Sequence, residues 1–466
     1  MAADVKVNPR LPRGMRDILP DKMILRQYVI SVIQQVFEEF GFEPLLTPAI
    51  EMSSTLMGKY GPDAERLIYD TRHRGGQTTP ALPPDVDEYV KKTGLRVTEQ
   101  PSEELSLRYD LSVPLCRVMA MYPDLPKPFK RYQISPVWRA ERPQKGRYRE
   151  FWQCDADSVG SASMLADAET INVIYEILNR LGFRDFVTKI NNRKILTGVG
   201  EFSGVSQEQL PALYRSIDKL DKIGLDGVKK ELQQNGMADD VIARMLDLLQ
   251  VRGESRAQLV VLKDRLAASP FALQGITELE ELIGYLDVVG IPMANYQVDF
   301  AMVRGLEYYT GPIYETVVEK PKIGSITGGG RYDNLVGMFL ERSFPATGTT
   351  IGIERIIDVM DELKMCPPEV GPTTAKVLVT IFQPDMVNAS LQLAGALRKT
   401  GVKVQLYADP VPLREQISYA SRKGIPYIAI LGPDEAASGQ VTIRKSRDEQ
   451  RTVALSAVAA LVKQWQ

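Results

Sequence analysis

The amino-acid sequence predicts an α+β protein in which an antiparallel sheet carries a helical insertion and a smaller α/β domain follows. Three patterns support this fold class. Residues 137–157 contain two strands with alternating polar and apolar side chains, joined by a basic loop. The segment from about residue 196 to 284 has helical patterns and few strand signals. After residue 375, strands alternate with helices. The 466 residues exceed the size at which one core keeps growing. We therefore expect one domain at 1–365, a linker at 366–374 and a second domain at 375–466.

The composition restricts where this chain works. Hydrophobic residues make up 44% of it, and no run approaches the roughly 20 apolar residues of a membrane span. The N-terminal segment MAADVKVNPRLPRG lacks the apolar stretch of a signal peptide, so we expect a cytoplasmic protein with no membrane association. Cys116, Cys154 and Cys366 are scattered and without CxxC spacing, which argues against a disulfide framework and a structural zinc site.

The composition also restricts the chemistry. The only histidine is His73, which we interpret as a loop residue without a function. Ser-His-Asp catalysis and histidine metal sites are therefore nearly excluded, and no protein metal cluster is assigned. Chemistry must rest on arginines and carboxylates, with any metal held by carboxylate and phosphate oxygens. A formal net charge of −2 excludes a globally basic nucleic-acid binder, so a nucleic acid would have to meet local patches.

The first elements expected along the chain are a helix and a strand. Residues 23–40 place apolar side chains on one helical stripe, and Gly41 is typical of a helix end. The segment FEPLLTPAIE at 42–51 reads as a strand whose prolines suit an edge or an interface. Residues 105–113 alternate again and predict a strand, after which Pro114 opens a helix.

The hairpin at 137–157 is the most informative segment. Strand side chains alternate between faces, so Gln133, Ser135, Arg139 and Glu141 share one face of the first strand. On the second strand one face carries a row of polar side chains: Gln153, Asp155 and Asp157. The joining loop carries four cations: Arg142, Lys145, Arg147 and Arg149. Such a face suits a small ligand that holds a phosphate and an amine together, whereas the simplest alternative is a solvated hairpin.

The remaining elements follow the same patterns. A helix is expected at 164–181, and strands return at 295–320 and continue through the glycine-rich ITGGGRYDNLV. In the C-terminal domain we expect strands at 377–381, 402–407, 427–431 and 441–444, with helices at 386–399, 413–423 and 455–465. This order predicts a partly parallel sheet.

Two further arginines lie in distinctive surroundings. Arg355 follows a strand of small residues where a helix begins, although a cation in the first turn opposes the helix dipole by about 0.3–1 kcal/mol. Arg304 precedes Gly305 and two tyrosines. Each can be an ordinary surface arginine, but a guanidinium also suits a phosphate or a purine ring. The run GGGRYD lacks the ending of a phosphate loop, and we interpret it as tight backbone packing beside the pocket.

Together these motifs resemble class II aminoacyl-tRNA synthetases, and most closely the histidyl-tRNA synthetase family, over nearly the whole chain. RGMRDILP with the helix and FEPLLTPAIE is similar to the dimer-interface motif, and LRYDLSVP to the amino-acid-binding strand. VWRAERPQKGRYREF is similar to the second class motif, TTIGIERI to the third, and VRGLEYYTG to the histidine-specific signature. The resemblance implies a class II catalytic domain followed by an anticodon-binding α/β domain.

The resemblance also implies a role for each matching residue. Arg139 would bind the α-phosphate of ATP, and Arg304 would lie between that phosphate and the amino-acid carboxylate, which makes these two the catalytic candidates. The other ATP-binding candidates are Glu141 and Phe151 at the adenine with Arg355, and Arg147 at the γ-phosphate. The other histidine-binding candidates are Asp110 and Ser112 at the α-amino group, and Gln153, Asp157, Tyr308 and Tyr309, with Asp157 on the imidazole.

The implied reaction needs no histidine base. The amino-acid carboxylate attacks the α-phosphorus, pyrophosphate leaves, and the acyl group passes to tRNA(His). The attacking carboxylate and the leaving pyrophosphate are both anionic, so fixed cations that position the substrates lower the activation barrier. Mg²⁺ would bridge the phosphates. The resemblance further implies a homodimer. The departures are mild: many relatives carry Asp where this chain has Glu307, and Glu where it has Asp110 or Asp157.

Two other interpretations remain. The first is a regulatory subunit that keeps the synthetase fold and binds histidine; such relatives typically lose the ATP-site arginines and the anticodon domain. The second is a synthetase for proline or threonine, against which VRGLEYYTG argues through resemblance. In the C-terminal domain the basic candidates for RNA contacts are Arg414, Arg422, Lys423, Arg444 and Lys445, although a solvated surface is the default for each.

Overall fold

The computed structural model forms two compact units, one built mainly from residues 29–364 and the other mainly from residues 365–466. No helix in the described part of the chain is both long and apolar enough to cross a bilayer. The described residues are 8–71, 104–144, 146–206, 209–217, 219–251, 253–303, 308–368, 370–445 and 449–464.

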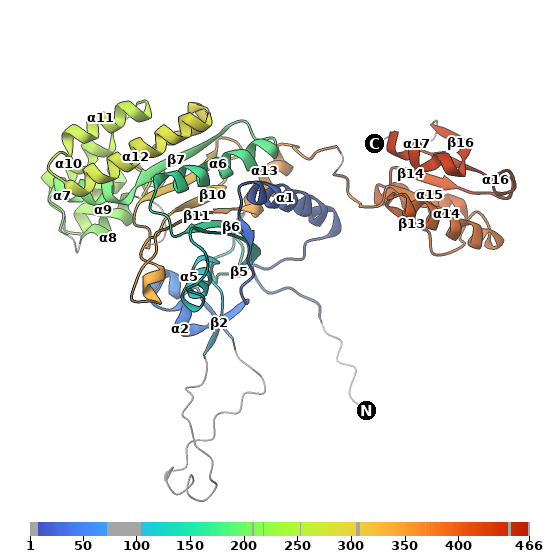
Figure 1. The fold of residues 1–466 in the computed structure, drawn as a ribbon, viewed down its shortest axis with the longest axis horizontal. Helices are drawn as coiled ribbons and strands as arrows, with labels where there is room; N and C mark the ends of the chain where they lie inside the picture. Colours follow the sequence, from blue (N-terminus) through green and yellow to red (C-terminus); the bar gives the residue numbers. More distant parts are fainter. Residues whose placement is uncertain are drawn as a thin grey trace, which may run out of the picture. The chain divides into compact units, whose positions relative to one another are not determined.

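An eight-stranded, mostly antiparallel sheet is the centre of the first unit. Its strand order is β1-β5-β6-β11-β10-β9-β7-β8, and only the two outermost pairings are parallel. Figure 1 shows β5, β6, β11, β10 and β7 following one another across this unit. The strand bounds are β1 Glu43–Pro44, β5 Phe129–Trp138, β6 Glu150–Val159, β7 Phe186–Asn192, β8 Tyr296–Val298, β9 Pro312–Val318, β10 Thr327–Arg331 and β11 Ala346–Ile351.

The two strands predicted around the basic loop are confirmed as β5 and β6. They pair antiparallel from Phe129 opposite Val159 to Trp138 opposite Glu150. The polar row of β6 is buried together with its apolar neighbours, since Cys154 and Ala156 are fully buried and Asp155 and Asp157 are only 3% and 2% exposed. The simplest alternative, a solvated hairpin, is therefore wrong.

The N-terminal helix is also confirmed. Helix α1, Pro20–Glu39, buries an apolar stripe that includes Val29, Ile33 and Phe37. The Phe37 ring packs on Tyr132 of β5 at a centroid distance of 5.6 Å. Gly41 follows with a φ of 74°, a left-handed conformation that ends helices at little cost in glycine.

The segment 42–51 was predicted as one strand, and this is wrong. Glu43–Pro44 forms β1 at the outer edge of the large sheet, whereas Ile50–Met52 forms β2 in a separate small sheet. Pro44 and Pro48 provide the reason, because proline has no N–H and cannot continue a ladder. The small sheet has the order β2-β4-β3, with β3 at Tyr69–Asp70 and β4 at Leu105–Leu107.

The single strand predicted at 105–113 is also wrong. Only β4 is extended, and helix α5 runs over Ser112–Met121. The Asp110 carboxylate accepts a hydrogen bond from the backbone N–H of Val113 at 3.1 Å. This is the contact by which an aspartate caps a helix start, so the helix begins two residues before the proline that was expected to open it.

Helices surround the sheet and fill the middle of the chain. The helix predicted at 164–181 is confirmed as α6, and α13 follows β11 as expected; α6 packs on β6, β10 and β11. Six helices, α7 to α12, follow β7 in the described residues up to Val289 and are drawn green to yellow in Figure 1. The bounds of the remaining helices of this unit are α2 Ser53–Leu56, α3 Pro62–Glu65, α6 Met164–Arg180, α7 Arg193–Ser203, α8 Leu210–Ile217, α9 Leu220–Gln234, α10 Asp239–Leu249, α11 Ser255–Arg265, α12 Pro270–Val289 and α13 Ile353–Glu362.

The second unit contains a five-stranded sheet in the order β13-β12-β14-β15-β16. β12 pairs parallel with both β13 and β14, and the other pairings are antiparallel, which confirms the partly parallel sheet. All seven expected elements are present within a few residues. The bounds are β12 Val377–Val379, α14 Val387–Lys399, β13 Val404–Leu406, α15 Leu413–Lys423, β14 Tyr427–Ile430, α16 Pro433–Ser438, β15 Gln440–Arg444, β16 Gln450–Ala454 and α17 Val458–Gln464.

Two elements of this unit were not predicted, α16 and β16. Strand β16 lies at the sheet edge and is exposed along nearly its whole length, so its sequence carries no alternation of apolar residues. Helix α16 has only six residues and buries none of them. The sequences of these two elements therefore lack the periodic apolar residues by which buried helices and strands are recognised.

A buried ion pair ties α6 to the sheet beneath it. Asp167 of α6 and Arg331 of β10 are 0% and 2% exposed at their side chains. The Arg331 Nε donates to Asp167 at 3.0 Å, and the Thr347 hydroxyl donates to the other carboxylate oxygen at 2.7 Å. Burial raises the pKa of Asp167 to about 6, although Arg331 opposes that shift.

Replacing Asp167 by alanine should lower the free energy of unfolding by about 3 to 5 kcal/mol, because the buried Arg331 would keep only the more exposed Asp333 as an ionic partner. Urea unfolding at pH 7.5 measures the change. The matched control is Asp240→Ala, which removes an i,i+4 partner of Arg244 whose carboxylate side chain is 68% exposed. The control should unfold at nearly the wild-type urea concentration. Equal midpoints for the two variants would contradict the structural role of the buried pair.

Candidate functional site

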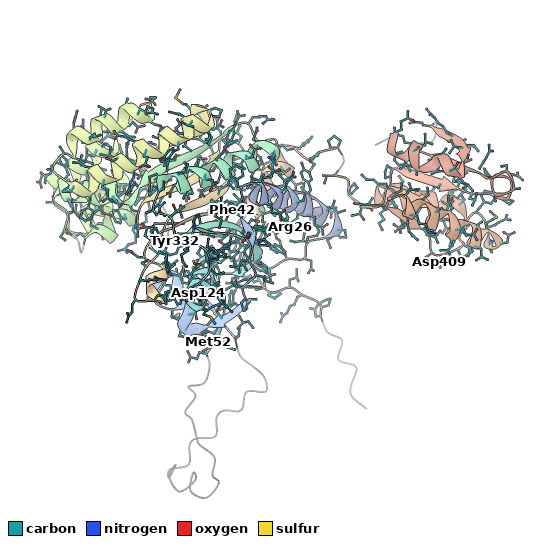
Figure 2. All side chains as sticks on the ribbon, in the orientation of Figure 1. Arg26, Phe42, Met52, Asp124, Tyr332 and Asp409 are labelled. Carbon is teal, nitrogen blue, oxygen red and sulfur yellow. The ribbon has the colours of Figure 1, made fainter. Side chains whose placement is uncertain are left out.

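A cavity of about 770 Å³ opens on the face of the large sheet that carries the polar row of β6. Its walls come from β6, β9, β10 and β11, from the loop between β5 and β6, and from the segments around residues 110 and 308. Tyr332 lies directly after β10 in this wall, and Figure 2 labels it within the first unit. The glycine-rich run was expected beside the pocket, and Gly328 and Gly329 do line it.

One end of the cavity is lined by buried carboxyl groups. Asp110, Asp155 and Asp157 are each at most 3% exposed. Burial raises the pKa of all three, to about 7 for Asp155. The compensating cation is Arg131 of β5, which is fully buried and whose Nη2 lies 2.8 Å from a carboxylate oxygen of Asp157. Because three carboxyl groups are buried together here, this part of the wall favours a cationic or hydrogen-donating ligand.

Tyrosine side chains complete that end. The Tyr60 hydroxyl donates to Asp110 at 2.8 Å, and the Tyr332 hydroxyl donates to Asp157. The Tyr308 ring lies 5.0 Å from the Tyr309 ring and 5.7 Å from the Tyr332 ring, measured between centroids. These rings exclude water and strengthen the electrostatic interactions of the carboxyl groups they surround.

Another part of the cavity wall is lined by arginines. The Arg139 guanidinium lies 4.3 Å from the Tyr109 ring centroid and 5.0 Å from that of Phe151, and its Nε donates to the Tyr109 carbonyl at 3.1 Å. Arg147 pairs with Glu141 at 3.1 Å. Arg355 donates from Nε to the Gly146 carbonyl at 3.3 Å. Guanidinium groups fixed in this way are suited to bind phosphate oxygens.

Among the described residues, the structure brings the candidates of the sequence analysis into this one cavity. Arg304 lies outside the described residues, as do Glu307, Lys145 and His73. Of the loop cations, Arg142 is exposed, whereas Arg149 donates to the carbonyl of Glu141. The candidates that line the cavity are Asp110, Ser112, Arg139, Glu141, Arg147, Phe151, Gln153, Asp157, Tyr308, Tyr309 and Arg355.

Several lining residues were not among the candidates. Asp155 shares the face of Gln153 and Asp157, so strand alternation already placed it beside them. Tyr332, Glu315 and Thr350 also line the cavity. Their sequence surroundings carry no comparable signal, because what brings them here is the pairing of β9, β10 and β11.

The N-terminal segment packs against the loop that carries the arginines. Gly14 has a φ of 85°, and its carbonyl accepts from the backbone N–H of Arg149 at 2.9 Å. Arg16 pairs with Glu354, and its guanidinium carbon lies 3.6 Å from the Tyr148 ring centroid. Both Glu354 and Tyr148 line the cavity. The segment therefore holds two parts of the cavity wall that are about 200 residues apart in sequence.

The comparisons with known proteins agree with this geometry. The family description "Histidyl-tRNA synthetase" matches residues 81–356, and "Anticodon binding domain" matches residues 376–465. The histidine--tRNA ligase of Porphyromonas gingivalis is 41% identical over 459 residues, which is 97% of this chain and 99% of that protein. The chain belongs to the histidyl-tRNA synthetase family.

Other members of the histidyl-tRNA synthetase family are similarly related. The histidine--tRNA ligase of Cytophaga hutchinsonii is 40% identical over 94% of this chain and 95% of that protein. The crystal structure of histidyl-tRNA synthetase from Nostoc sp. PCC 7120 has a TM-score of 0.83 and 32% identity, covering 99% of this chain and all of that one. The predicted α+β class II fold with its C-terminal α/β anticodon-binding domain is confirmed.

Replacing Arg16 by alanine should raise the KM for ATP roughly fivefold, because the loop at 139–149 loses a pair and a ring contact that together contribute about 1 kcal/mol. The KM for the amino acid should stay unchanged, since its end of the cavity is not touched. ATP–pyrophosphate exchange measures both constants. Arg10→Ala, an exposed change in the same segment, is the control. Equal KM values for ATP in the two variants would contradict this role of Arg16.

Proposed function

We propose that this chain activates histidine with ATP and transfers the histidyl group to the 3′ end of tRNA(His). Its relatives are named for that activity, and one observation supports it most directly. A single cavity is lined by arginines in one part of its wall and by buried carboxyl groups in another. A ligand pair that fits this polarity has a polyphosphate at one end and an amine with a hydrogen-donating side chain at the other.

The reaction follows from that arrangement. A carboxylate oxygen of histidine attacks the α-phosphorus of ATP, the bond to the β-phosphate bridging oxygen breaks, and pyrophosphate leaves. The new bond is a mixed anhydride, histidyl-adenylate. A ribose hydroxyl of the terminal adenosine of tRNA then attacks its carbonyl carbon, loses its proton and releases AMP. Fixed guanidinium groups offset the repulsion between the two anionic reactants in the first step.

We propose the following residue roles. Arg139 and Arg304 bind the groups that react, and Arg147 binds the γ-phosphate. The geometry of the Arg139 side chain supports its role, since two rings and a backbone carbonyl hold its guanidinium in the cavity wall. Asp110 suits the α-amino group, because one of its carboxylate oxygens has no hydrogen-bond partner among the described residues. The remaining proposed contacts are Glu141, Phe151 and Arg355 for adenine, and Ser112, Gln153, Asp157, Tyr308 and Tyr309 for histidine.

Mg²⁺ fits the arginine end as an ion held mainly by the substrate. Glu141 and Glu354 line the cavity but are paired with Arg147 and Arg16. Glu315 lines it beside Ser325, whose hydroxyl donates to it at 2.6 Å. We propose that Glu315 and phosphate oxygens would hold the ion, which agrees with the few protein ligands that Mg²⁺ commonly takes. When bound, the ion would neutralise charge on the phosphates.

We further propose that residues 1–365 form the catalytic domain with a helical insertion at about 196–284, that 366–374 is a linker, and that 375–466 binds the anticodon arm of the tRNA. Arg414 and Arg422 are exposed on α15 and are available to RNA phosphates. We place the protein in the cytoplasm, since Cys116, Cys154 and Cys366 are free thiols.

We also propose a homodimer. Exposed apolar side chains on one edge of the first unit support a second copy as the partner. Leu46 follows β1 and is 79% exposed, and Met121 and Tyr122 at the end of α5 are 60% and 56% exposed. Met52 of β2, which Figure 2 labels, is 39% exposed, and an ion pair between Arg117 and Glu51 joins α5 to β2 beside it.

The activity is tested by ATP–pyrophosphate exchange with a panel of amino acids. Histidine should support exchange, and Arg139→Ala should reduce the rate about a hundredfold, because one preorganised contact to a phosphate contributes about 3 kcal/mol. Arg184→Ala, an exposed change between α6 and β7, is the control. Exchange with proline or threonine alone would overturn the proposal. Histidine binding without exchange in folded wild-type protein would instead favour a regulatory subunit.

The dimer is tested by analytical ultracentrifugation. The wild-type chain should sediment as a dimer at micromolar concentration, and Leu46→Glu should shift it towards monomer, because a charge would be buried in the contact. Val288→Glu is the matched control, since Val288 is 84% exposed at the end of α12, away from that edge in the sequence. A monomeric wild-type protein, or an equal response of both variants, would contradict the proposed contact.

A further inference from the structure

A tyrosine behind the cavity wall, Tyr60, has no part in the residue roles proposed above. It lies between α2 and α3, is 3% exposed and does not itself line the cavity. Its hydroxyl donates to Oδ1 of Asp110 at 2.8 Å, and Asp110 does line the cavity. Tyr60 therefore reaches the site through a residue of its wall.

The two oxygens of the Asp110 carboxylate have different surroundings. Oδ1 accepts from the Tyr60 hydroxyl at 2.8 Å and from the backbone N–H of Val113 at 3.1 Å. Oδ2 is buried and has no hydrogen-bond partner among the described residues. Two donors on one oxygen fix the rotation of the carboxylate, because a turn about its Cβ–Cγ bond would break both hydrogen bonds. The other oxygen is thereby kept available to a ligand.

Tyr60 also favours the charge that Asp110 needs in order to bind an ammonium group. Burial raises the pKa of Asp110, and the Tyr60 hydroxyl is the strongest influence that lowers it. The Val113 amide and the guanidinium groups of Arg139 and Arg131 act in the same direction but less strongly. A hydrogen bond to the charged form of a carboxyl group stabilises that form. The titratable groups that face Asp110 come from several elements and are Tyr60, Tyr109, Cys116, Arg131, Arg139, Asp155, Tyr308 and Tyr309.

The ring of Tyr60 makes a separate contact. Its centroid lies 4.8 Å from that of Tyr109, at an interplanar angle of 48°. Tyr109 in turn holds the Arg139 guanidinium through its ring and its backbone carbonyl. A substitution that removes the hydroxyl but keeps the ring should therefore disturb the carboxylate and leave the arginine in place.

We propose that Tyr60 is a positioning residue for amino-acid binding, whose hydroxyl turns Asp110 so that its available carboxylate oxygen meets the α-ammonium group of the substrate. This inference rests on the proposed function, in which Asp110 contacts that group. An acceptor that is already oriented and ionised loses less free energy on binding than one that must first be ordered. The segment between α2 and α3 thus contributes to substrate affinity without touching the substrate.

The first test measures ATP–pyrophosphate exchange by Tyr60→Phe. The KM for histidine at pH 7.5 should rise about tenfold, because a buried charged acceptor loses a hydrogen bond that orients it. The KM for ATP should not change, since the ring remains. Tyr296→Phe is the matched control, because Tyr296 of β8 is 4% exposed and donates to Asp287 at 2.6 Å but does not line the cavity. Equal histidine KM values in the two variants would overturn the proposal.

A ligand without the α-amino group separates positioning from a general disturbance of the pocket. Imidazolepropionate has the imidazole and the carboxylate of histidine but no amine. Its inhibition constant against histidine should be the same in the wild type and in Tyr60→Phe, although histidine itself binds the variant more weakly. If both ligands lose affinity by the same factor, Tyr60 supports only the structure of the pocket and the proposal is overturned.

The pH dependence reports the charge of Asp110. Removing the Tyr60 hydroxyl should raise the pKa of Asp110 further, so the variant loses the ionised carboxylate at a higher pH than the wild type does. The ratio of the histidine KM of Tyr60→Phe to that of the wild type should therefore rise as the pH falls from 8 to 5. Titration of the substrate itself cancels in this ratio. A ratio that stays constant or falls would contradict the stabilisation of ionised Asp110 by Tyr60.

Calorimetric titration with histidine, without ATP, keeps this inference separate from the proposed function. Normal exchange in the wild type, together with a wild-type histidine affinity in Tyr60→Phe, would overturn the role of Tyr60 and leave the proposed function standing. Absence of exchange in folded wild-type protein would overturn the function, and the histidine affinities of the two proteins would still decide the role of Tyr60. If neither protein binds histidine, both proposals fail.

Discussion

The site depends on one cross-strand pair, Arg131 opposite Asp157, in the register of β5 and β6. The same register sets Asp155 opposite Gln133 and Gln153 opposite Ser135. A shift of one residue would turn every one of these side chains to the other face of the sheet. The attraction between the buried guanidinium and the buried carboxylate therefore stabilises the register that gathers the other charged groups of the pocket.

This arrangement separates charge within one cavity. Carboxyl groups and tyrosines line one part of its wall, and guanidinium groups held by rings and backbone carbonyls line another. Burying these carboxyl groups lowers the stability of the fold, because burial disfavours their charged form and raises the pKa of Asp155 and of Asp110. A buried ion pair can often be replaced by apolar side chains with little loss of folding free energy. The pocket keeps them because a substrate that carries both signs of charge meets complementary groups at each end.

The sequence predicts those helices and strands whose buried side chains recur in a periodic pattern. β5, β6 and α6 were recognised because apolar residues recur with the period of a strand or a helix. The edge strand β16 has no such pattern, and the segment 105–113 changes from strand to helix through a single capping contact of Asp110. The site residues on one strand were foreseen as a group. Tyr332 and Glu315 were not, because only the pairing of β9, β10 and β11 brings them there.

The contact of the N-terminal segment with the arginine loop has a consequence for biosynthesis. Arg16 leaves the ribosome before its partner Glu354, which is 338 residues further along the chain. At translation rates of roughly 5 to 20 residues per second, the two are separated by about 20 to 70 s. The pair between Arg16 and Glu354 cannot form during that interval, although the contacts of Gly14 and Arg16 with residues 148 and 149 can. The part of the cavity wall that Arg16 holds is therefore completed in two stages, first at the loop that carries the arginines and later at Glu354.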